Sequence, residues 1–144
     1  MLKVAFIVPP HVELLDLAGP AQVFTEARFN GYELGIEFYS YQDSVVSTSG
    51  IGFGKVANFR EANLQSGDFL FIPGMNFEYV SSELFRNEIA FFEWLNECAG
   101  RMVNICSVCD AAFALGEAAL LDGRECTTHW RRVAALQSRF PRLW

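Results

Sequence analysis

Three short apolar segments are spaced along this chain, and they restrict what it can fold into more than any other feature. They are KVAFIV at 3–8, DFLFIPG at 68–74 and RMVNICSV at 101–108. Apolar runs of this length, the first two ended by proline, are typical of strands buried on both faces. Strands are buried in this way where helices cover both sides of a parallel sheet. The segments therefore predict an α/β protein with a mostly parallel sheet.

The segments between these runs predict further strands and the helices that cover the sheet. LGIEFYSY at 34–41 is expected to be a strand, and the β-branched stretch at 44–59, interrupted by Gly and Ser, a hairpin. Another helix is expected over 110–119. Apolar residues at helical spacing predict a helix over 81–99, on the positions Phe85, Ile89, Phe92, Leu95 and Ala99.

Local signals predict where two of the helices begin and end. Gly19-Pro20 is expected to open the first helix, because proline fits the first helical turn, and Gly31 to end it. The expected apolar stripe of this helix is Val23, Phe24 and Ala27. Near the C-terminus, Thr127 and Thr128 are expected to cap a last helix that runs to Phe140.

Length and composition indicate a single domain over 1–144. A chain of this size buries roughly 70% of its unfolded surface on folding, so it needs no disulfide or metal ion for stability. The N-terminus has an uninterrupted run of only five apolar residues, 4–8, between Lys3 and Pro9-Pro10, too few for a secretory signal peptide. No run approaches the about 18 apolar residues of a membrane span. We therefore expect a cytoplasmic protein, away from membranes, whose four cysteines are reduced.

The charge balance argues against direct binding of nucleic acid. The net charge is −6, from 11 basic and 17 acidic residues, and the C-terminal arginines are too sparse for a phosphate-binding surface. With two histidines and no pair of CxxC motifs, no metal site is expected. The glycines of GIGFG at 50–54 lie in the expected hairpin and not between a strand and a helix, so no dinucleotide site is expected. The sequence predicts no cofactor.

Cys109 stands where a strand is expected to turn sharply into a helix. Such a nucleophile elbow needs small residues two before and two after the reactive side chain. Ser107 and Ala111 satisfy this for Cys109, whereas Val108 is too bulky to satisfy it for Cys106. Cys106 is therefore interpreted as a packing residue within the strand, and Cys109 as the candidate nucleophile.

The neighbours of Cys109 act on its reactivity in opposite directions. A helix N-terminus lowers the pKa of a thiol, and the backbone amide of Asp110, after the nucleophile, can form half of an oxyanion hole. A second amide can come from the Gly74-Met75 turn. The carboxylate of Asp110, however, disfavours a thiolate beside it. A catalytic thiol and a buried structural cysteine both remain open.

Three segments are expected to meet at the carboxyl ends of the strands, where parallel sheets bind ligands. They are the loop around Asp16, the turn at Gly74-Met75 and the turn at Cys109. Asp16 could orient Cys109 or share a proton with it, or it could only support the turn before the first helix. These two roles are equally compatible with the sequence.

The two histidines are weaker candidates. His129 could act as a general base, but the threonines before it already explain the local sequence, so a place in the first turn of a helix is preferred. His11 follows Pro9-Pro10 in a loop that could border the pocket, and nothing in its spacing requires a role.

Four segments carry a resemblance to a known family: LLDLAGPAQVF at 14–24, IPG at 72–74, SVCDAAFALGEAALLDGRECTTHW at 107–130 and FPRLW at 140–144. Over nearly its whole length the chain resembles the ThiJ/PfpI superfamily, and within it the class I glutamine amidotransferase-like N-terminal domain of AraC-type transcriptional regulators. Isocyanide hydratases are similar as well. The resemblance implies a flavodoxin-like three-layer fold, a homodimer, and a small-molecule pocket at the elbow.

By this resemblance, Cys109 matches the elbow cysteine, Asp16 the acidic residue that approaches it, and Gly74 and Met75 the turn on the oxyanion side. Asp110 stands where catalytic relatives have Thr or His. Met75 stands where the family has a second glycine, so its side chain is expected to intrude on the pocket. The family domain also continues beyond FPRLW, so a domain lacking its last elements is expected, with DNA contacted only by a helix-turn-helix region downstream.

These departures favour sensing over turnover. The sequence therefore predicts the ligand-sensing and dimerising domain of an AraC-type regulator, with a small metabolite as its partner. The alternative is a cysteine-dependent enzyme of isocyanide hydratase or amidase type, in which Cys109 attacks a small electrophile and Asp16 handles protons. A third possibility is a dimerisation scaffold with an occluded pocket.

Overall fold

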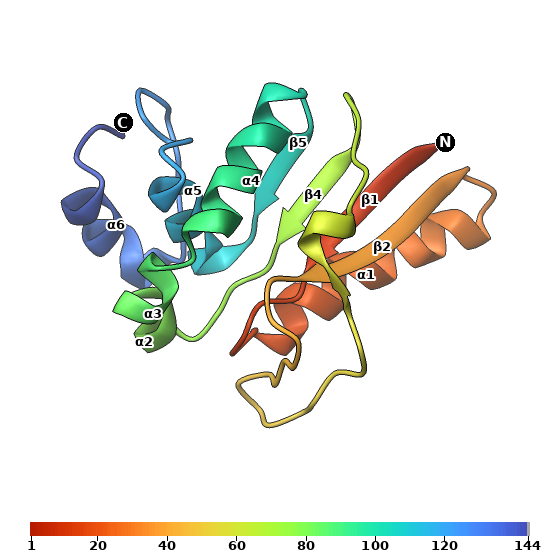
Figure 1. Cartoon of the computed structure of the whole chain (residues 1–144), viewed down its shortest axis with the longest axis horizontal. Helices are drawn as coiled ribbons and strands as arrows, with labels where there is room; N and C mark the ends of the chain where they lie inside the picture. Colours follow the sequence, from red (N-terminus) through yellow and green to blue (C-terminus); the bar gives the residue numbers. More distant parts are fainter. Residues whose placement is uncertain (144) are drawn as a thin grey trace.

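The computed structural model describes residues 1–143 and shows one five-stranded sheet (Figure 1). All neighbouring strands are parallel, in the order β3-β2-β1-β4-β5. The predicted α/β class with a mostly parallel sheet is confirmed. The strands are β1 (Leu2–Ile7), β2 (Leu34–Ser40), β3 (Ala57–Asn58), β4 (Phe69–Ile72) and β5 (Asn104–Ser107).

Helices lie on both faces of the sheet and form the two outer layers (Figure 1). Helix α1 (Leu14–Phe29) covers one face, and α4 (Ile89–Gly100) and α5 (Ala112–Glu117) cover the other. Two one-turn helices follow β4, namely α2 (Phe77–Val80) and α3 (Glu83–Arg86), and α6 (Val133–Arg139) packs near α5. This is the three-layer, flavodoxin-like arrangement that the resemblance implied.

The apolar strands are explained by this layering, because each strand buries alternate residues on opposite faces. In β1, Val4 and Phe6 pack toward α1 with Leu17, whereas Ala5 and Ile7 join the larger core under α4 and α5. All four of these β1 residues are fully buried. A strand buried on both sides needs a continuous apolar run, which is the pattern that the sequence shows at β1.

The burial expected for the run at 101–108 is not seen. β5 is an edge strand, and its residues, Asn104–Ser107, are half-buried or exposed.

The order in which strands are added to the sheet reverses at β1. The connection through α1 leads from β1 to β2 on one side, and the connection through α4 leads from β4 to β5 on the other. Because crossovers between parallel strands are right-handed, these two helices must lie on opposite faces. The loops after β1 and β4 therefore diverge and leave a crevice at the carboxyl ends of the strands.

The start of α1 was predicted wrongly. The helix begins at Leu14, so Pro20 lies inside it and Asp16 lies in its first turn. Backbone contacts with the loop after β4 fix the early start, since the N–H of Glu13 donates to the carbonyl of Gly74 at 2.8 Å. The expected stripe is also shifted: Val23 is 65% exposed, and Leu17 is the buried residue of the helix.

Two other segments differ from their expected structure. Residues 44–59 do not form a two-stranded hairpin: a single antiparallel bridge joins Val46 to Gly52, and residues 57–58 form the parallel edge strand β3. The helix expected over 81–99 is broken between α3 and α4, and Ile89 is 55% exposed because it lies at the first position of α4.

The last helical segment is capped by a residue other than the expected threonines. The His129 side chain accepts a hydrogen bond from the N–H of Arg131 at 3.1 Å and so caps the 3₁₀ turn Trp130–Arg132. Thr128 instead donates its hydroxyl to the carbonyl of Cys109 at 3.0 Å. This tertiary hydrogen bond removes Thr128 from a capping position.

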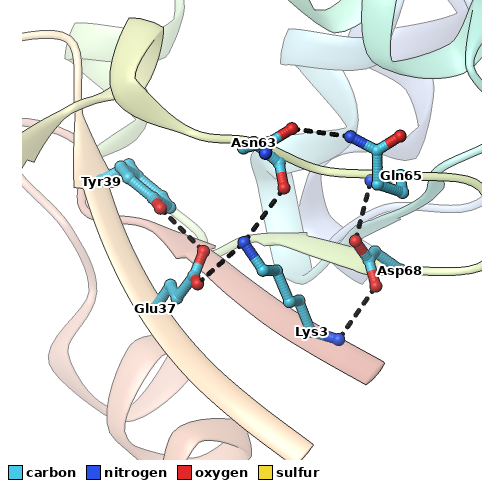
Figure 2. A network of polar contacts seen from close by, with 6 residues as sticks. All are labelled: Lys3, Glu37, Tyr39, Asn63, Gln65 and Asp68. Carbon is cyan, nitrogen blue, oxygen red and sulfur yellow. Dashed lines mark hydrogen bonds and ion pairs between the residues drawn. The ribbon is translucent and has the colours of Figure 1, made fainter. Parts of the chain in front are cut away.

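A polar network fastens the chain at the opposite, amino end of the sheet (Figure 2). Asp68, which is buried, accepts hydrogen bonds from the backbone N–H groups of Lys3 and Gln65. The ammonium of Lys3 pairs with Glu37 at 3.2 Å and donates to the carbonyl of Asn63. The loop between β3 and β4 is thereby held to β1 and β2, away from the crevice.

Within residues 1–143, no helix is both long enough and apolar enough to cross a lipid bilayer.

Candidate functional site

Cys109 occupies a strained turn between β5 and α5. Its φ is 57°, in the left-handed region that residues with a side chain rarely adopt. The turn is held on the strand side, where the N–H of Val108 donates to the carbonyl of Ile72, and by the hydrogen bond from Thr128 to Cys109. Such strain costs about 1–3 kcal/mol and persists only where surrounding contacts enforce it. The expected sharp strand-to-helix turn is therefore present at Cys109.

Backbone hydrogen bonds join the loop after β1 to the loop after β4. Val12 and Met75 form an antiparallel bridge, and the N–H of Asn76 donates to the carbonyl of His11 at 2.9 Å. With the bond from Glu13 to Gly74, these contacts lock the first turn of α1 against the end of β4. This brings Asp16 beside the elbow.

Gly74 is the point at which the three predicted segments touch. A Cβ atom on Gly74 would lie 3.0 Å from the Cβ of Cys109 and 3.2 Å from the Oδ1 of Asp110, and still closer to the Oδ2 of Asp16. The absence of a side chain at Gly74 thus permits the thiol and the two carboxylates to meet. The Oδ2 atom of Asp16 is buried without a hydrogen-bond partner among the described residues.

Asp110 turns its side chain back to the loop after β4. The residue is 5% exposed, and its Oδ1 accepts a hydrogen bond from the backbone N–H of Met75 at 2.9 Å. Met75 is the amide expected to face an oxyanion from the Gly74-Met75 turn. In this structure the backbone N–H of Met75 already donates its hydrogen bond to the Asp110 carboxylate.

The environment keeps the Cys109 thiol protonated. Burial raises the pKa of Cys109 to about 11, and the carboxylates of Asp110 and Asp16 raise it further, although the backbone amide of Asp110 acts in the opposite direction. Burial also raises the pKa of Asp110 above its usual value, against a lowering by the Met75 amide. The favourable position at a helix start is thus outweighed by desolvation and negative charge.

A cavity of about 940 Å³ lies in front of the elbow. Its size is near the upper end of the range found for small-molecule sites. Cys109, Asp110, Asp16 and Met75 all contribute to its wall. The other lining residues come from the start of α1, the loop after β2, α2 and the C-terminal turn: Glu13, Leu14, Leu15, Thr48, Ser49, Asn76, Phe77, Glu78, His129 and Arg132.

The structure brings together most, but not all, of the predicted site residues. His129 lines the cavity, whereas His11 is exposed and lies outside the lining, against the tilted ring of Tyr79 at 5.1 Å between ring centroids. The expected intrusion of the Met75 side chain is not seen, because the residue is 1% exposed and packs in the larger core. Cys106 lies within β5, as expected, but it is only half-buried.

The polar cavity residues that sequence reasoning missed include Glu13, Thr48, Glu78 and Arg132. Glu13 and Glu78 add negative charge, and Thr48 donates its hydroxyl to Glu13 at 3.1 Å. The guanidinium of Arg132 lies 3.8 Å from the ring centroid of Phe77. No local pattern marks these residues, since each comes from a different segment. Among residues 1–143, no cluster of three or more His, Cys, Asp or Glu side chains is arranged to hold a metal ion.

We expect Gly74→Ala to destabilise the protein by about 1–3 kcal/mol, because the new methyl group overlaps Asp16 and presses on Cys109. Gly100→Ala, at the last residue of α4, is the matched control: its new methyl group would meet no neighbour within 4 Å, and alanine favours a helix over glycine, so a gain of up to about 1 kcal/mol is expected. Urea unfolding measures both changes. Equal stability of the two variants would contradict the crowding at Gly74.

We expect Cys109 to react slowly with iodoacetamide at pH 7, about tenfold to a hundredfold more slowly than an ordinary thiol, since its pKa of about 11 leaves little thiolate. The alkylation rate should rise with pH up to about 11. Peptide mass mapping measures this rate at Cys109 specifically. Because this pKa is raised on folding, its contribution to stability is present below the ordinary thiol pKa and is lost as pH rises through 11. An inflection at or below pH 8 would overturn the assignment.

Comparison with known proteins agrees with this geometry. The sequence profile of the DJ-1/PfpI family matches residues 2–139. An uncharacterized protein in the cpoL 5' region of Streptomyces lividans is 37% identical over 139 residues, which cover 96% of this chain and 95% of that protein. The crystal structure of an AraC family transcriptional regulator from Pseudomonas putida superposes with a TM-score of 0.75 at 21% identity, covering 99% of this chain and 75% of that one.

Two further relatives are longer proteins, and this chain matches a part of each. The HTH-type transcriptional regulator CdhR of Pseudomonas aeruginosa is 32% identical over 80 residues, 56% of this chain and 22% of the regulator. The isonitrile hydratase of Pseudomonas putida is 26% identical over 129 residues, 90% of this chain and 53% of that enzyme. The match over 2–139, together with the elbow at Cys109, shows that the chain belongs to the DJ-1/PfpI family.

Proposed function

We propose that this chain is the ligand-sensing domain of an AraC-type transcriptional regulator that works in the cytoplasm. A small metabolite would bind in the cavity beside Cys109, Asp16 and Met75. DNA would be contacted by a helix-turn-helix region that follows these residues in the whole protein. The observation that carries the proposal is a large cavity next to a thiol that is held protonated.

The arrangement supports binding more than turnover. Nucleophilic catalysis needs a thiolate and free donors for the developing negative charge. Here the Cys109 pKa is raised to about 11, and the Met75 amide is already bonded to Asp110. The polar side chains that line the cavity can recognise a ligand, whereas the surroundings of Cys109 do not activate its thiol.

Relatives of both kinds bear on the proposal. A regulator, CdhR, is similar in sequence, and the superposed AraC family regulator has the same fold. A metabolite that binds one arrangement of the regulator more tightly than another would shift the population between them, which is sufficient for a transcriptional response.

An enzyme is the second candidate, favoured by the position of Asp16 beside Cys109 and by the similarity to isonitrile hydratase. In that case the sulfur of Cys109 would add to the carbon of the electrophile while its proton passes to the substrate. Water would then release the hydrated product and restore the thiol. Asp16 would relay the protons.

We also propose that the chain forms a homodimer through the outer face of α1. Leu15, which is 83% exposed, and Val23 lie two turns apart on this face, with the exposed small residues Ala18 and Gly19 between them. Exposed apolar side chains that share one face of a helix are typical of interaction surfaces. Small residues between them allow a second helix to approach closely.

The sensing proposal predicts a saturable rise in melting temperature with some member of a metabolite panel, measured by thermal shift. Cys109→Ala should weaken this response without abolishing it, because Asp16, Asp110 and Arg132 also line the cavity. Consumption of that compound by the unmodified protein, lost in Cys109→Ala, would favour the enzyme. A reading frame that ends soon after codon 144 without a helix-turn-helix region would contradict the regulator.

The dimer proposal predicts that Leu15→Asp shifts the protein to the monomer in sedimentation velocity, because an ionised carboxylate would be buried in the interface. Leu84→Asp, at an equally exposed position on α3, is the control and should leave the association state unchanged. A wild-type protein that is monomeric at all concentrations would refute the interface.

A further inference from the structure

The backbone N–H of Met75 is the donor that the sequence predicts for an anion on the oxyanion side of Cys109. It belongs to the turn after β4, and both Met75 and Cys109 line the cavity. A backbone donor beside a cavity at the carboxyl end of a parallel sheet would ordinarily take a carboxylate or a developing oxyanion from a ligand.

That donor is already satisfied by the protein. The Oδ1 of Asp110 accepts the Met75 N–H at 2.9 Å, and both residues are buried. A hydrogen bond from a backbone amide to a charged carboxylate is stronger than one between neutral groups. A ligand anion could reach Met75 only by displacing this carboxylate, which would leave a buried charge without its partner.

We propose that Asp110 is a built-in anion that fills the anion position of the pocket and thereby sets the orientation of its ligand: the end that faces Cys109 is neutral or cationic. This inference rests on the proposed ligand site and adds the charge of the ligand to it. Asp110 is thus a specificity-determining residue for that site.

The remaining charges of the cavity agree with this orientation. Glu13, Asp16 and Glu78 line the cavity together with Asp110, and their negative potential repels an anion from the elbow. Arg132 contributes positive charge to the lining and lies over the ring of Phe77 on α2. Any anionic group of the ligand therefore belongs on the Arg132 side.

The test compares three variants of the full chain with acetate as the probe anion. Asp110→Ala frees the Met75 amide, Asp110→Ser does so with a polar side chain in case the alanine variant does not fold, and Asp110→Asn removes the charge but keeps an oxygen that can accept the same hydrogen bond. The readout is the chemical shift of the Met75 amide proton, titrated with sodium acetate at constant ionic strength.

In Asp110→Ala or Asp110→Ser, acetate should shift the Met75 amide resonance saturably. The affinity should exceed the upper limit set by the unresponsive wild type by about tenfold or more, which corresponds to about 1.4 kcal/mol. The wild type and Asp110→Asn should not respond at Met75. A response of the wild type equal to that of Asp110→Ala would overturn the proposal. A response of Asp110→Asn would overturn it as well. That result would mean that the negative charge of Asp110 excludes the anion, and not the hydrogen bond by which residue 110 already uses the Met75 amide.

The same titration separates this inference from the proposed function. If no metabolite binds the wild type but the Met75 amide of Asp110→Ala binds acetate, the sensing proposal fails and the role of Asp110 stands. If a metabolite that carries its only anionic group toward Cys109 stabilises the wild type, with contacts to the Met75 amide, the sensing proposal stands and the role of Asp110 is refuted.

Discussion

The close approach of two loops at Gly74 is the contact on which the rest of the site depends. The loops after β1 and β4 would diverge at the reversal in strand order, but the bridge between Val12 and Met75 and the bond from Glu13 to Gly74 hold them together. Because Gly74 has no side chain, the side chains of Asp16, Cys109 and Asp110 can all approach it. The cavity, the buried carboxylates and the start of α1 all follow from this junction.

Burial of negative charge then decides what the elbow can do. A cysteine at the start of a helix is usually activated by the helix dipole and the unpaired amides. At Cys109, desolvation and two nearby carboxylates prevail, and the thiol stays protonated at neutral pH. Asp110 also takes the Met75 amide. Cys109 thus has the strained turn that is typical of a nucleophile, but its surroundings disfavour the thiolate that a nucleophile needs.

Features that depend on neighbouring residues in the sequence were predicted correctly, whereas features that depend on distant contacts were not. The strands β1, β2, β4 and β5 were placed well from local patterns, and β1 is buried on both faces as expected. The expected burial of β5 was wrong, because β5 is an edge strand and its residues are half-buried or exposed. The sharp turn at Cys109 was found from Ser107 and Ala111, since the turn itself requires small neighbours. Cys109, Asp16 and Gly74 could be placed at the same edge of the sheet from the order of strands and loops.

The failures share a different cause, which is that a distant partner outweighed the local signal. Proline at Pro20 favours a helix start, but contacts with the loop after β4 let α1 begin earlier, at Leu14. Thr128 favours a cap, but its hydroxyl is used by Cys109, and His129 caps the turn instead.

The sequence by itself thus determined the fold class, the elbow and its candidate thiol, because these depend on residue type and spacing along the chain. Only the tertiary structure decided that Asp110 bonds to Met75, that Glu13, Glu78 and Arg132 join the cavity, and that Cys109 is protonated. Hydrogen bonding and desolvation depend on which atoms meet in space, and segments far apart in the chain supply those atoms.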